Sequence, residues 1–321
     1  MIERGRFAPT PSGALHIGSA RTAVASALAA WRAGGRWCLR VEDLDVTRTV
    51  SGAVEAMLED LRWLGLEWDE GPGAAETHAP SRQSERGALY REALSVLRRA
   101  GRVYPCACSR REVEGASMAP HGAEPVYPGT CATRDPDEVI AAARSKGRQV
   151  SWRFRVDAHR PAVTVRDGFA GDFTQDVARD VGDFVVFRAD GVAAYQLAVV
   201  VDDAVQEVTE VLRGDDLLAS APRQVMLYEA LGARAPRWAH IPLVLGVDGQ
   251  RLAKRHGAMG VRELRARGHD AKTLLREILA TLGVDDFDGT SLRALASRWD
   301  LASIPRNSPR WSVADERFEA S

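Results

Sequence analysis

The chain has 321 residues, 45% of them hydrophobic, and its 43 basic and 44 acidic side chains give a formal net charge of -1. This composition permits one elaborated domain or two, and it excludes a uniformly basic nucleic-acid-binding protein but not a local basic face. The first residues carry charges and prolines instead of the apolar core of a signal peptide, and no run approaches the roughly 18 apolar residues of a membrane span. We therefore expect a soluble cytoplasmic protein.

The first hundred residues predict alternating strands and helices. Apolar residues at strand or helix spacing indicate strands over 2–8 and 37–41 and helices over 19–33, 51–65 and 82–100. Glycines follow the apolar pattern where each of the three helices is expected to end. Because alternating strands and helices form parallel sheets with helices on the faces, the pattern predicts an α/β domain.

The middle of the chain breaks this alternation. Residues 102–150 are rich in Pro, Gly, Cys and Arg, residues 151–195 have the pattern of strands and turns, and helix and strand patterns return in 196–247. The tail from about residue 260 is helical and basic. These patterns predict the first half of an α/β domain over 1–100, an insertion over 101–190, its second half over 191–247, and a carboxyl-terminal helical part over 248–321.

Three cysteines are grouped in the expected insertion. Cys106 and Cys108 form a C-x-C pair, and Cys131 follows about twenty residues later, which indicates a zinc site that lacks one ligand. Three free thiols are the alternative, since a cytoplasmic setting argues against disulfides. Candidates for the fourth ligand are Tyr127, His121 and water, and spacing alone slightly favours His121 because histidine is the common ligand.

Two separate segments have the character of a nucleotide site. Residues 14–19, reading ALHIGS, lie where a strand and a Pro/Gly-rich turn lead into a helix, and such a helix start binds anions. His16 there can hydrogen-bond phosphate oxygens, and Gly18 permits close approach of a base, although a capping histidine and a turn glycine are the simpler alternative. Far downstream, Lys254 in a cationic loop can neutralise charge at an α-phosphate that a carboxylate attacks.

The charge distribution also favours a phosphate-bearing partner. Segment 81–111 carries eight arginines against two acids, and segment 251–276 carries eight basic residues against two acids. Two basic stretches on a neutral chain fit an RNA that contacts particular surfaces, although solvated helix faces produce the same pattern.

Together, these segments resemble class I aminoacyl-tRNA synthetases. HIGS at 16–19 is similar to the HIGH signature, and RLAKR at 251–255 is similar to the KMSKS signature, with Lys254 as its one lysine. The resemblance implies a Rossmann-type α/β catalytic domain with a zinc-bearing insertion and a short helical carboxyl-terminal domain. Blocks at 6–13, 39–45, 195–203 and 211–216 look like the glutamyl branch of this family.

The resemblance to the glutamyl branch implies a glutamate pocket. Arg6 and Arg213 supply positive charge for the two carboxylates of glutamate, because a guanidinium binds a carboxylate in fork geometry. Glu42 balances the α-ammonium, and the Tyr195 hydroxyl lines the pocket. A surface ion pair between Arg213 and one of the two aspartates shortly after it is the alternative. The other implied contacts are Phe7, Ala8, Pro9 and Thr10.

The resemblance also implies the first reaction step. His16, Gly18 and Lys254 hold ATP, with Mg²⁺ expected, while the glutamate carboxylate attacks the α-phosphate and releases pyrophosphate. Catalysis of this kind is mainly positioning and charge stabilisation, without a covalent enzyme intermediate.

Length then separates the relatives within the branch. Only about sixty residues follow the lysine loop, too few for a large anticodon-binding domain, so the chain resembles the truncated glutamyl-queuosine tRNA(Asp) synthetases. In that subfamily a queuosine hydroxyl in the anticodon loop of tRNA(Asp) attacks the adenylate. Its zinc motif, Cys-x-Cys…Tyr-x-x-x-Cys, is matched by Cys106, Cys108, Tyr127 and Cys131, so the resemblance replaces His121 by Tyr127.

Three other functions remain open from the sequence. The chain could charge tRNA(Glu), activate glutamate for a different acceptor, or serve as a nonenzymatic RNA-binding module. A monomer without membrane contact is expected in each case.

Overall fold

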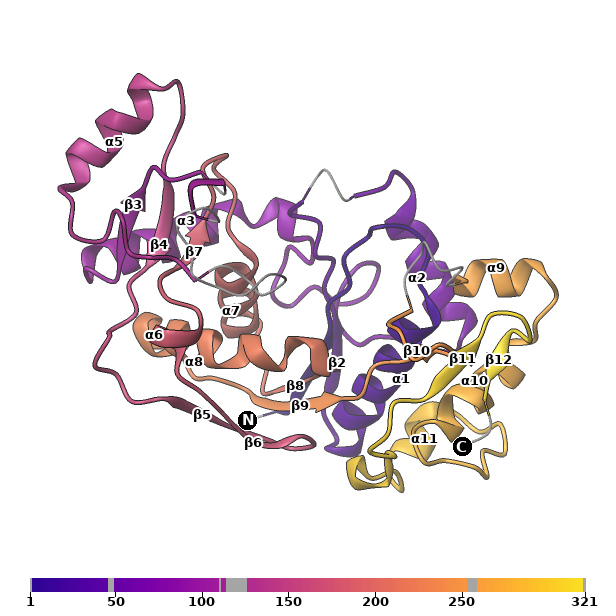
Figure 1. The fold of residues 1–321 in the computed structure, drawn as a ribbon. Helices are drawn as coiled ribbons and strands as arrows, with labels where there is room; N and C mark the ends of the chain where they lie inside the picture. Colours follow the sequence, from indigo (N-terminus) through magenta and orange to yellow (C-terminus); the bar gives the residue numbers. More distant parts are fainter. Residues whose placement is uncertain (1, 46–48, 110, 114–125, 253–258, 320–321) are drawn as a thin grey trace.

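The computed structural model describes residues 2–45, 49–109, 111–113, 126–252 and 259–319. Its main sheet has six strands in the order β2-β1-β8-β9-β5-β6 (Figure 1). The first five strands in this order all run parallel to one another. The sixth, β6, pairs antiparallel with β5 at one edge. Their bounds are β1 (Arg4–Phe7), β2 (Arg36–Leu39), β5 (Val163–Asp167), β6 (Gly171–Gln175), β8 (Glu210–Gly214) and β9 (Arg237–Ile241).

The strand order reverses beside β1. The next strand in the chain, β2, lies on one side of β1, whereas β8 lies on the other side. The carboxyl ends of β1 and β8 therefore flank a topological switch point, where open α/β sheets bind their ligands. The predicted parallel sheet is confirmed, and its topology indicates where a site belongs.

Helix α1 (Ile17–Arg32) lies directly on the main sheet. Its alanine-rich sequence favours the helix and presents small side chains to β1. A Cβ at Gly5 would lie 2.8 Å from the Cβ of Ala30, so the glycine in β1 permits this close packing. The helix is thereby fixed at the switch point, with its amino-terminus beside the carboxyl end of β1.

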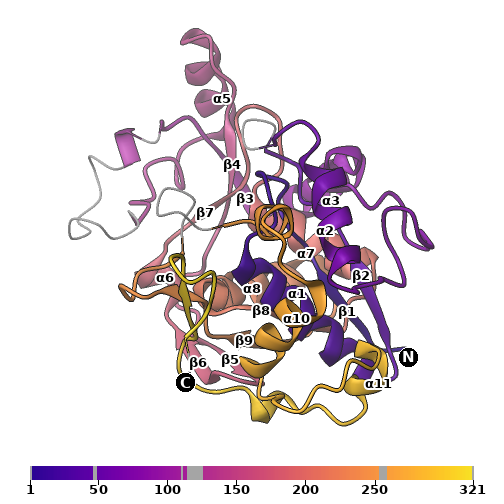
Figure 2. The ribbon, with the colours of Figure 1, turned by 90° about the vertical axis from the view of Figure 1, so that its right-hand side faces the viewer.

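The other face of α1 is covered by helices from the end of the chain. Helices α10 (Ala271–Ala280) and α11 (Leu292–Ala296) pack against it (Figure 2). Arg21 is buried on this side of α1: its Nε donates to Thr281 Oγ1 at 2.9 Å, and its Nη1 donates to the carbonyl of Pro242 at 2.8 Å. Burial lowers the pKa of Arg21 to about 10. The carboxyl-terminal segment thus shares one core with the start of the chain.

Helices α3 (Gly87–Arg99), α7 (Tyr195–Val205) and α8 (Ala221–Leu231) surround a second core, whereas the apolar side chains of α2 (Ala53–Trp63) belong to the core that contains α1. The second core contains Tyr90, Leu97, Leu197 and Met226, with strand residues such as Val211. Among the described residues, no helix combines the length and apolar character that crossing a bilayer requires.

Residues 101–190, predicted as one insertion, contribute to two sheets. One is a separate antiparallel sheet of β3 (Val103–Cys106), β4 (Ser151–Phe154) and β7 (Phe184–Phe187). Strands β5 and β6, however, extend the main sheet next to β9. The alternating burial of β5 is typical of a half-buried strand, but such a pattern does not specify the sheet that the strand joins. The short helices of this segment are α5 (Pro136–Ser145) and α6 (Val177–Asp180).

The carboxyl-terminal part contains strands as well as the predicted helices. Strands β11 (Arg310–Ser312) and β12 (Arg317–Phe318) form a small sheet with β10 (Leu245–Gly246). Trp311 is fully buried there, edge-on to Phe318 at 5.0 Å between ring centroids. Burial of this ring accounts for the turn of the tail back toward β10, which the helical prediction for the tail did not include.

The elements predicted for the first hundred residues are confirmed within a few residues. The largest shift is at the helix predicted over 82–100, because the chain first forms a 3-10 turn at Gln83–Glu85 and α3 begins only at Gly87. The expected strand and helix before and after ALHIGS are β1 and α1.

Asp60 is a buried acid whose replacement should stabilise the protein. Its side chain is fully buried in α2, and Arg262 Nε of α9 (Val261–Ala266) lies 3.9 Å from its Oδ1. Burial raises the pKa of Asp60 to about 6, above about 3.9 in an unfolded chain, so its ionisation costs stability as pH rises between these values. We expect Asp60→Asn to raise the free energy of unfolding by about 1 to 3 kcal/mol near neutral pH and not below about pH 4.

Urea denaturation across this pH range measures the effect. Glu55→Gln, at an exposed position of the same helix, is the matched control and should show no such pH dependence. A lower stability of Asp60→Asn near neutral pH would contradict the expectation.

Candidate active site

A cavity of about 530 Å³ opens at the switch point. It lies at the carboxyl ends of β1 and β8 and reaches the start of α1. The structure brings together every described residue predicted for the glutamate and ATP sites, whereas Lys254 lies outside the described residues. The predicted residues that line the cavity are Arg6, Phe7, Ala8, Pro9, Thr10, His16, Gly18, Glu42, Tyr195 and Arg213.

His16 is the amino-terminal cap of α1. Its Nδ1 accepts a hydrogen bond from the backbone N–H of Ser19 at 3.2 Å, and its Nε2 lies 3.0 Å from Ser19 Oγ. A Cβ on Gly18 would lie 3.4 Å from Nδ1, so the glycine leaves the space beside the imidazole open. The simpler alternative, a capping histidine, is therefore correct for the local structure, and the cap also faces the cavity.

The two ends of the lysine loop lie at the same corner. Leu252 lines the cavity before the loop, and Gly260 after it forms a β-bridge with His16. The backbone N–H of Val261 donates to the carbonyl of Leu15 at 2.7 Å. A Cβ on Gly260 would lie 2.5 Å from the Cβ of Ala14, so glycine is needed for this approach. The segments on both sides of Lys254 thus meet the ALHIGS segment.

Arg6 and Glu42 lie on one wall of the cavity and are both held by partners. Arg6 Nε and Nη2 each donate to a carboxylate oxygen of Asp203 at 3.3 Å. Glu42 accepts from Arg40 Nη2 at 3.1 Å. Burial raises the pKa of Glu42 against the effect of the two arginines, so an ammonium group bound beside it would favour its ionised form.

Arg213 is buried and has only neutral partners among the described residues. Its Nε donates to His240 Nε2 at 2.9 Å, and its Nη2 donates to the carbonyl of Leu217 at 3.2 Å and to Gln224 Oε1 at 3.0 Å. Its Nη1 lies 3.5 Å from the Tyr195 hydroxyl. Burial lowers its pKa. An anionic group in the cavity would therefore meet a guanidinium that no described carboxylate contacts.

The alternative ion pair of Arg213 with a neighbouring aspartate is wrong in the described part of the chain. Asp216 instead pairs with Arg251, whose Nη2 lies 2.8 Å from its Oδ2. That pair links the segment after β8 to the beginning of the lysine loop.

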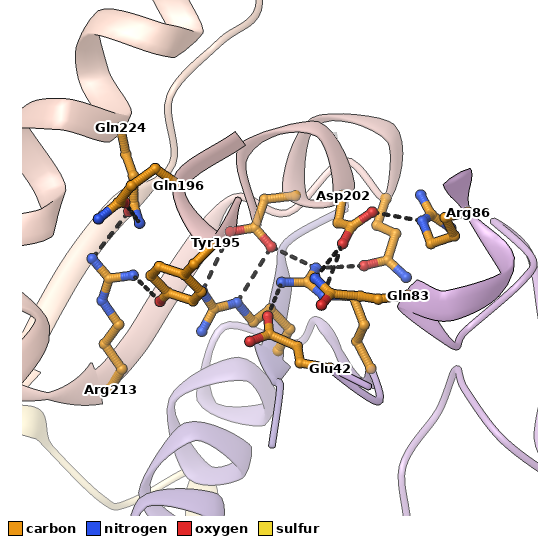
Figure 3. A network of polar contacts seen from close by, with 12 residues as sticks. Glu42, Gln83, Arg86, Tyr195, Gln196, Asp202, Arg213 and Gln224 are labelled. Atoms are coloured by element: carbon orange, nitrogen blue, oxygen red, sulfur yellow. Dashed lines mark hydrogen bonds and ion pairs between the residues drawn. The ribbon is translucent and has the colours of Figure 1, made fainter. Parts of the chain in front are cut away.

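A buried charged network lies beneath the cavity (Figure 3). Arg40 is fully buried and donates through Nη1 to Asp203 Oδ1 at 2.6 Å and to Gln206 Oε1 at 2.7 Å. Because Arg40 also binds Glu42, and Asp203 also binds Arg6, the network fixes both residues of the cavity wall. The network was not predicted from the sequence. The available signal was a pair of aspartates, Asp202 and Asp203, in the otherwise apolar helix α7.

The cysteine cluster is formed as predicted. The Sγ atoms of Cys106, Cys108 and Cys131 lie within 4.8 Å of one another, with 3.7 Å between those of Cys108 and Cys131. A tetrahedral zinc with sulfur bonds of about 2.3 Å separates its sulfurs by about 3.8 Å, so the cluster fits such an ion. The Tyr127 hydroxyl lies 3.4 Å from Cys106 Sγ, and His121 lies outside the described residues.

The surroundings of the cluster favour a thiolate at Cys106. Burial raises the pKa of this thiol, but hydrogen bonds with Tyr127 and Arg153 outweigh the effect and leave the pKa below its ordinary value. Burial raises the pKa of Cys108 to about 12. The Arg153 guanidinium also lies 3.7 Å from the centroid of the Tyr127 ring. The thiolate is the form of cysteine that binds metals, so the positive charge of Arg153, which favours a thiolate, supports metal binding.

An open, largely parallel sheet with its cavity at the strand-order reversal is the arrangement of α/β domains that bind ligands at a topological switch point. The family model described as tRNA synthetases class I (E and Q), catalytic domain, matches residues 4–305, and the chain belongs to this family of ligases.

Individual relatives agree with the family. The chain is 50% identical over 310 residues to a protein of Symbiobacterium thermophilum named glutamyl-Q tRNA(Asp) synthetase, and the match covers 95% of each chain. It is 45% identical to glutamate--tRNA ligase 1 of Halorhodospira halophila over 99% of this chain but 65% of the relative. A solved glutamate tRNA ligase of Elizabethkingia meningosepticum, in complex with its amino acid, superposes with a TM-score of 0.85 at 27% identity, covering 98% of this chain and 68% of that one.

Proposed function

We propose that the protein activates glutamate with ATP and transfers it to queuosine in the anticodon loop of tRNA(Asp). The observation that carries the choice of an acidic amino acid is Arg213, a buried cation in the cavity with only neutral described partners. The side-chain carboxylate of glutamate would pair with it through Nη1, the guanidinium nitrogen on the Tyr195 side of the cavity. A neutral side chain would leave the buried guanidinium without a carboxylate in contact with it, which is costly.

The other cavity residues take the roles that the first step requires. Glu42 binds the α-ammonium, Arg6 adds positive charge, and the Tyr195 hydroxyl contacts the substrate. His16, Gly18 and Lys254 hold ATP with Mg²⁺. An oxygen of the α-carboxylate of glutamate forms a bond to the α-phosphorus of ATP. The bond between that phosphorus and the oxygen that bridges to the β-phosphate breaks, and pyrophosphate leaves with the electron pair of this bond. Fixed charges stabilise the transition state.

A second cavity supports transfer to a nucleoside. It has a volume of about 1050 Å³ and shares Thr10, Glu42 and Tyr195 with the first cavity. A bulky acceptor placed there would reach the activated glutamate without crossing the ATP corner. The choice of queuosine follows the names of relatives such as that of S. thermophilum. We propose further that the protein acts in the cytoplasm as a monomer.

Radiolabelled glutamate and four preparations of tRNA(Asp) test the proposed acceptor. The tRNA is made with or without queuosine, and each form ends in ordinary adenosine or in 2′,3′-dideoxyadenosine, which lacks the terminal hydroxyls. We expect labelling of both queuosine-containing forms and of neither queuosine-free form. Label that disappears with the terminal hydroxyls would instead indicate ordinary charging, for which tRNA(Glu) is the alternative substrate. Glutamate-dependent exchange between ATP and pyrophosphate would exclude a nonenzymatic RNA-binding module.

We also propose that Cys106, Cys108, Cys131 and Tyr127 hold a structural zinc ion. Such an ion would cross-link β3 to the segment around Cys131 and fix the wall of the second cavity, which Cys106 and Cys108 line. We expect Cys108→Ser to lower the zinc content measured by elemental analysis of the purified protein. Cys38→Ala, at a buried thiol outside the cluster, is the control and should keep the metal. Equal zinc in Cys108→Ser and the unaltered protein would count against the assignment.

A further inference from the structure

The partners of Arg213 lead to two residues that no step of the proposed reaction uses. We propose that Asp167 and His240 are positioning residues that orient Arg213 and keep its charge available to the substrate carboxylate. The inference rests on the proposed activation of glutamate, and not on the identity of the final acceptor.

Three neighbouring strands bring these side chains together. Arg213 of β8 and His240 of β9 are register partners, and Asp167 ends β5 on the far side of β9. His240 Nδ1 lies 2.5 Å from Asp167 Oδ2, and both side chains are fully buried. The other oxygen of Asp167 accepts from the backbone N–H of Phe169, Ala170 and His240 at 2.8 to 3.0 Å. Asp167 is thus rigidly held.

The donors and acceptors fix the tautomer of His240. An ionised carboxylate only accepts hydrogen bonds, so Nδ1 of His240 must carry the hydrogen. Nε2 is then the acceptor that the Nε–H of Arg213 requires, since a guanidinium only donates. Burial lowers the pKa of His240, and hydrogen bonds lower that of Asp167 despite its burial. The charged groups that act on the imidazole are Arg213, Asp167 and Arg6, and the neutral form is favoured.

The imidazole separates the carboxylate of Asp167 from the guanidinium. A carboxylate in direct contact with Arg213 would neutralise it and compete with the substrate for its donors. With His240 on Nε and with Gln224 and Leu217 on Nη2, the Nη1 end is directed toward Tyr195 and the cavity. The arrangement therefore orients the guanidinium while leaving its charge to be balanced by a ligand at Nη1, which favours glutamate over glutamine.

Asp167→Asn reverses this arrangement without changing the size of the side chain. The backbone donors hold one carbonyl-like oxygen, so the amide NH₂ faces His240 Nδ1, which must then accept, and Nε2 carries a hydrogen toward Arg213. In the glutamate-dependent exchange of ATP with pyrophosphate, we expect the KM for glutamate to rise about tenfold or more and the KM for ATP to change by less than about twofold. As the KM for glutamate rises, the preference for glutamate over glutamine should decrease.

A matched pair at His240 tests the same point independently. His240→Gln keeps an acceptor for Arg213, so its KM for glutamate should stay within about threefold of that of the unaltered protein. His240→Leu removes the acceptor, so its KM for glutamate should rise as in Asp167→Asn. Combining Asp167→Asn with His240→Gln should restore glutamate binding. The oxygen of the introduced glutamine has two lone pairs, so it can accept both from Arg213 and from the amide introduced at position 167. A purely structural role for Asp167 would not give this rescue.

The outcomes separate this inference from the proposed function. An unchanged KM for glutamate in Asp167→Asn, or equal rises for glutamate and ATP without rescue, would overturn the inference. Exchange without transfer to queuosine would overturn only the proposed acceptor, since exchange needs no tRNA. Absence of glutamate-dependent exchange in the unaltered protein would overturn both.

Discussion

Replacement of Arg213 by leucine is expected to remove glutamate activation while leaving the protein folded. The substrate carboxylate would lose its buried counter-charge, and breaking such a pair costs about 3 to 5 kcal/mol. The kcat/KM for glutamate-dependent pyrophosphate exchange should therefore fall by about 150- to 5,000-fold. Stability should change less than activity, because the removal of a buried charge offsets the cost of leaving three acceptors without their donor.

Exchange kinetics and urea denaturation on the same preparation measure both parts of this prediction. Arg237→Leu provides the matched control, because that arginine is exposed and pairs with Glu3 at the sheet surface. It should keep full exchange activity. If Arg213→Leu retained glutamate-dependent exchange within about threefold, another group would have to bind the side-chain carboxylate.

Asp202→Ala is expected to give the largest loss of stability. Asp202 is fully buried and accepts from Arg86 Nε at 2.6 Å, from Gln83 Nε2 at 2.7 Å and from the Tyr90 hydroxyl at 3.0 Å (Figure 3). Its loss would leave Arg86 buried without its carboxylate, which costs about 3 to 5 kcal/mol in comparable pairs. The free energy of unfolding should fall by that amount in urea denaturation.

The exposed ion pair between Arg32 and Asp300 provides the comparison. Its atoms lie 2.8 Å apart, but both side chains are about half exposed. Exposed pairs contribute at most ~1 kcal/mol because water competes for both charges, so Arg32→Ala should be nearly neutral. Equal effects of Asp202→Ala and Arg32→Ala would show that Asp202 of α7 does not hold Arg86 in place as described.

The order of strands and helices could be predicted from local patterns. Apolar spacing and terminal glycines located β1, α1, β2 and α2 because each element buries one face of its own sequence. The sheet joined by β5 could not be predicted in this way. Its alternating pattern records which residues are buried but not which neighbouring strand covers its edge.

In the candidate site, too, some residues could be predicted from the sequence and others could not. Arg6, Glu42, Tyr195 and Arg213 were recognised because they stand in segments similar to a known family, and the structure places all four on one cavity. Asp167 and His240 were missed because each is an ordinary residue in its own strand. Their role depends on the hydrogen bond between them, which joins residues 73 positions apart in the chain. No local sequence pattern predicts such a contact.

The burial of α1 between the sheet and the last helices has a consequence for synthesis on the ribosome. Within the described ranges, the guanidinium of Arg21 donates to Thr281, 260 residues later, and to Pro242. While the carboxyl-terminal helices are still inside the exit tunnel, the outer face of α1 is apolar, carries a cation without these acceptors and faces solvent. Nascent chains that expose such surfaces aggregate readily and fold slowly. Because α1, α10 and α11 share one core, the amino-terminal half cannot complete that core before the carboxyl-terminal helices have emerged.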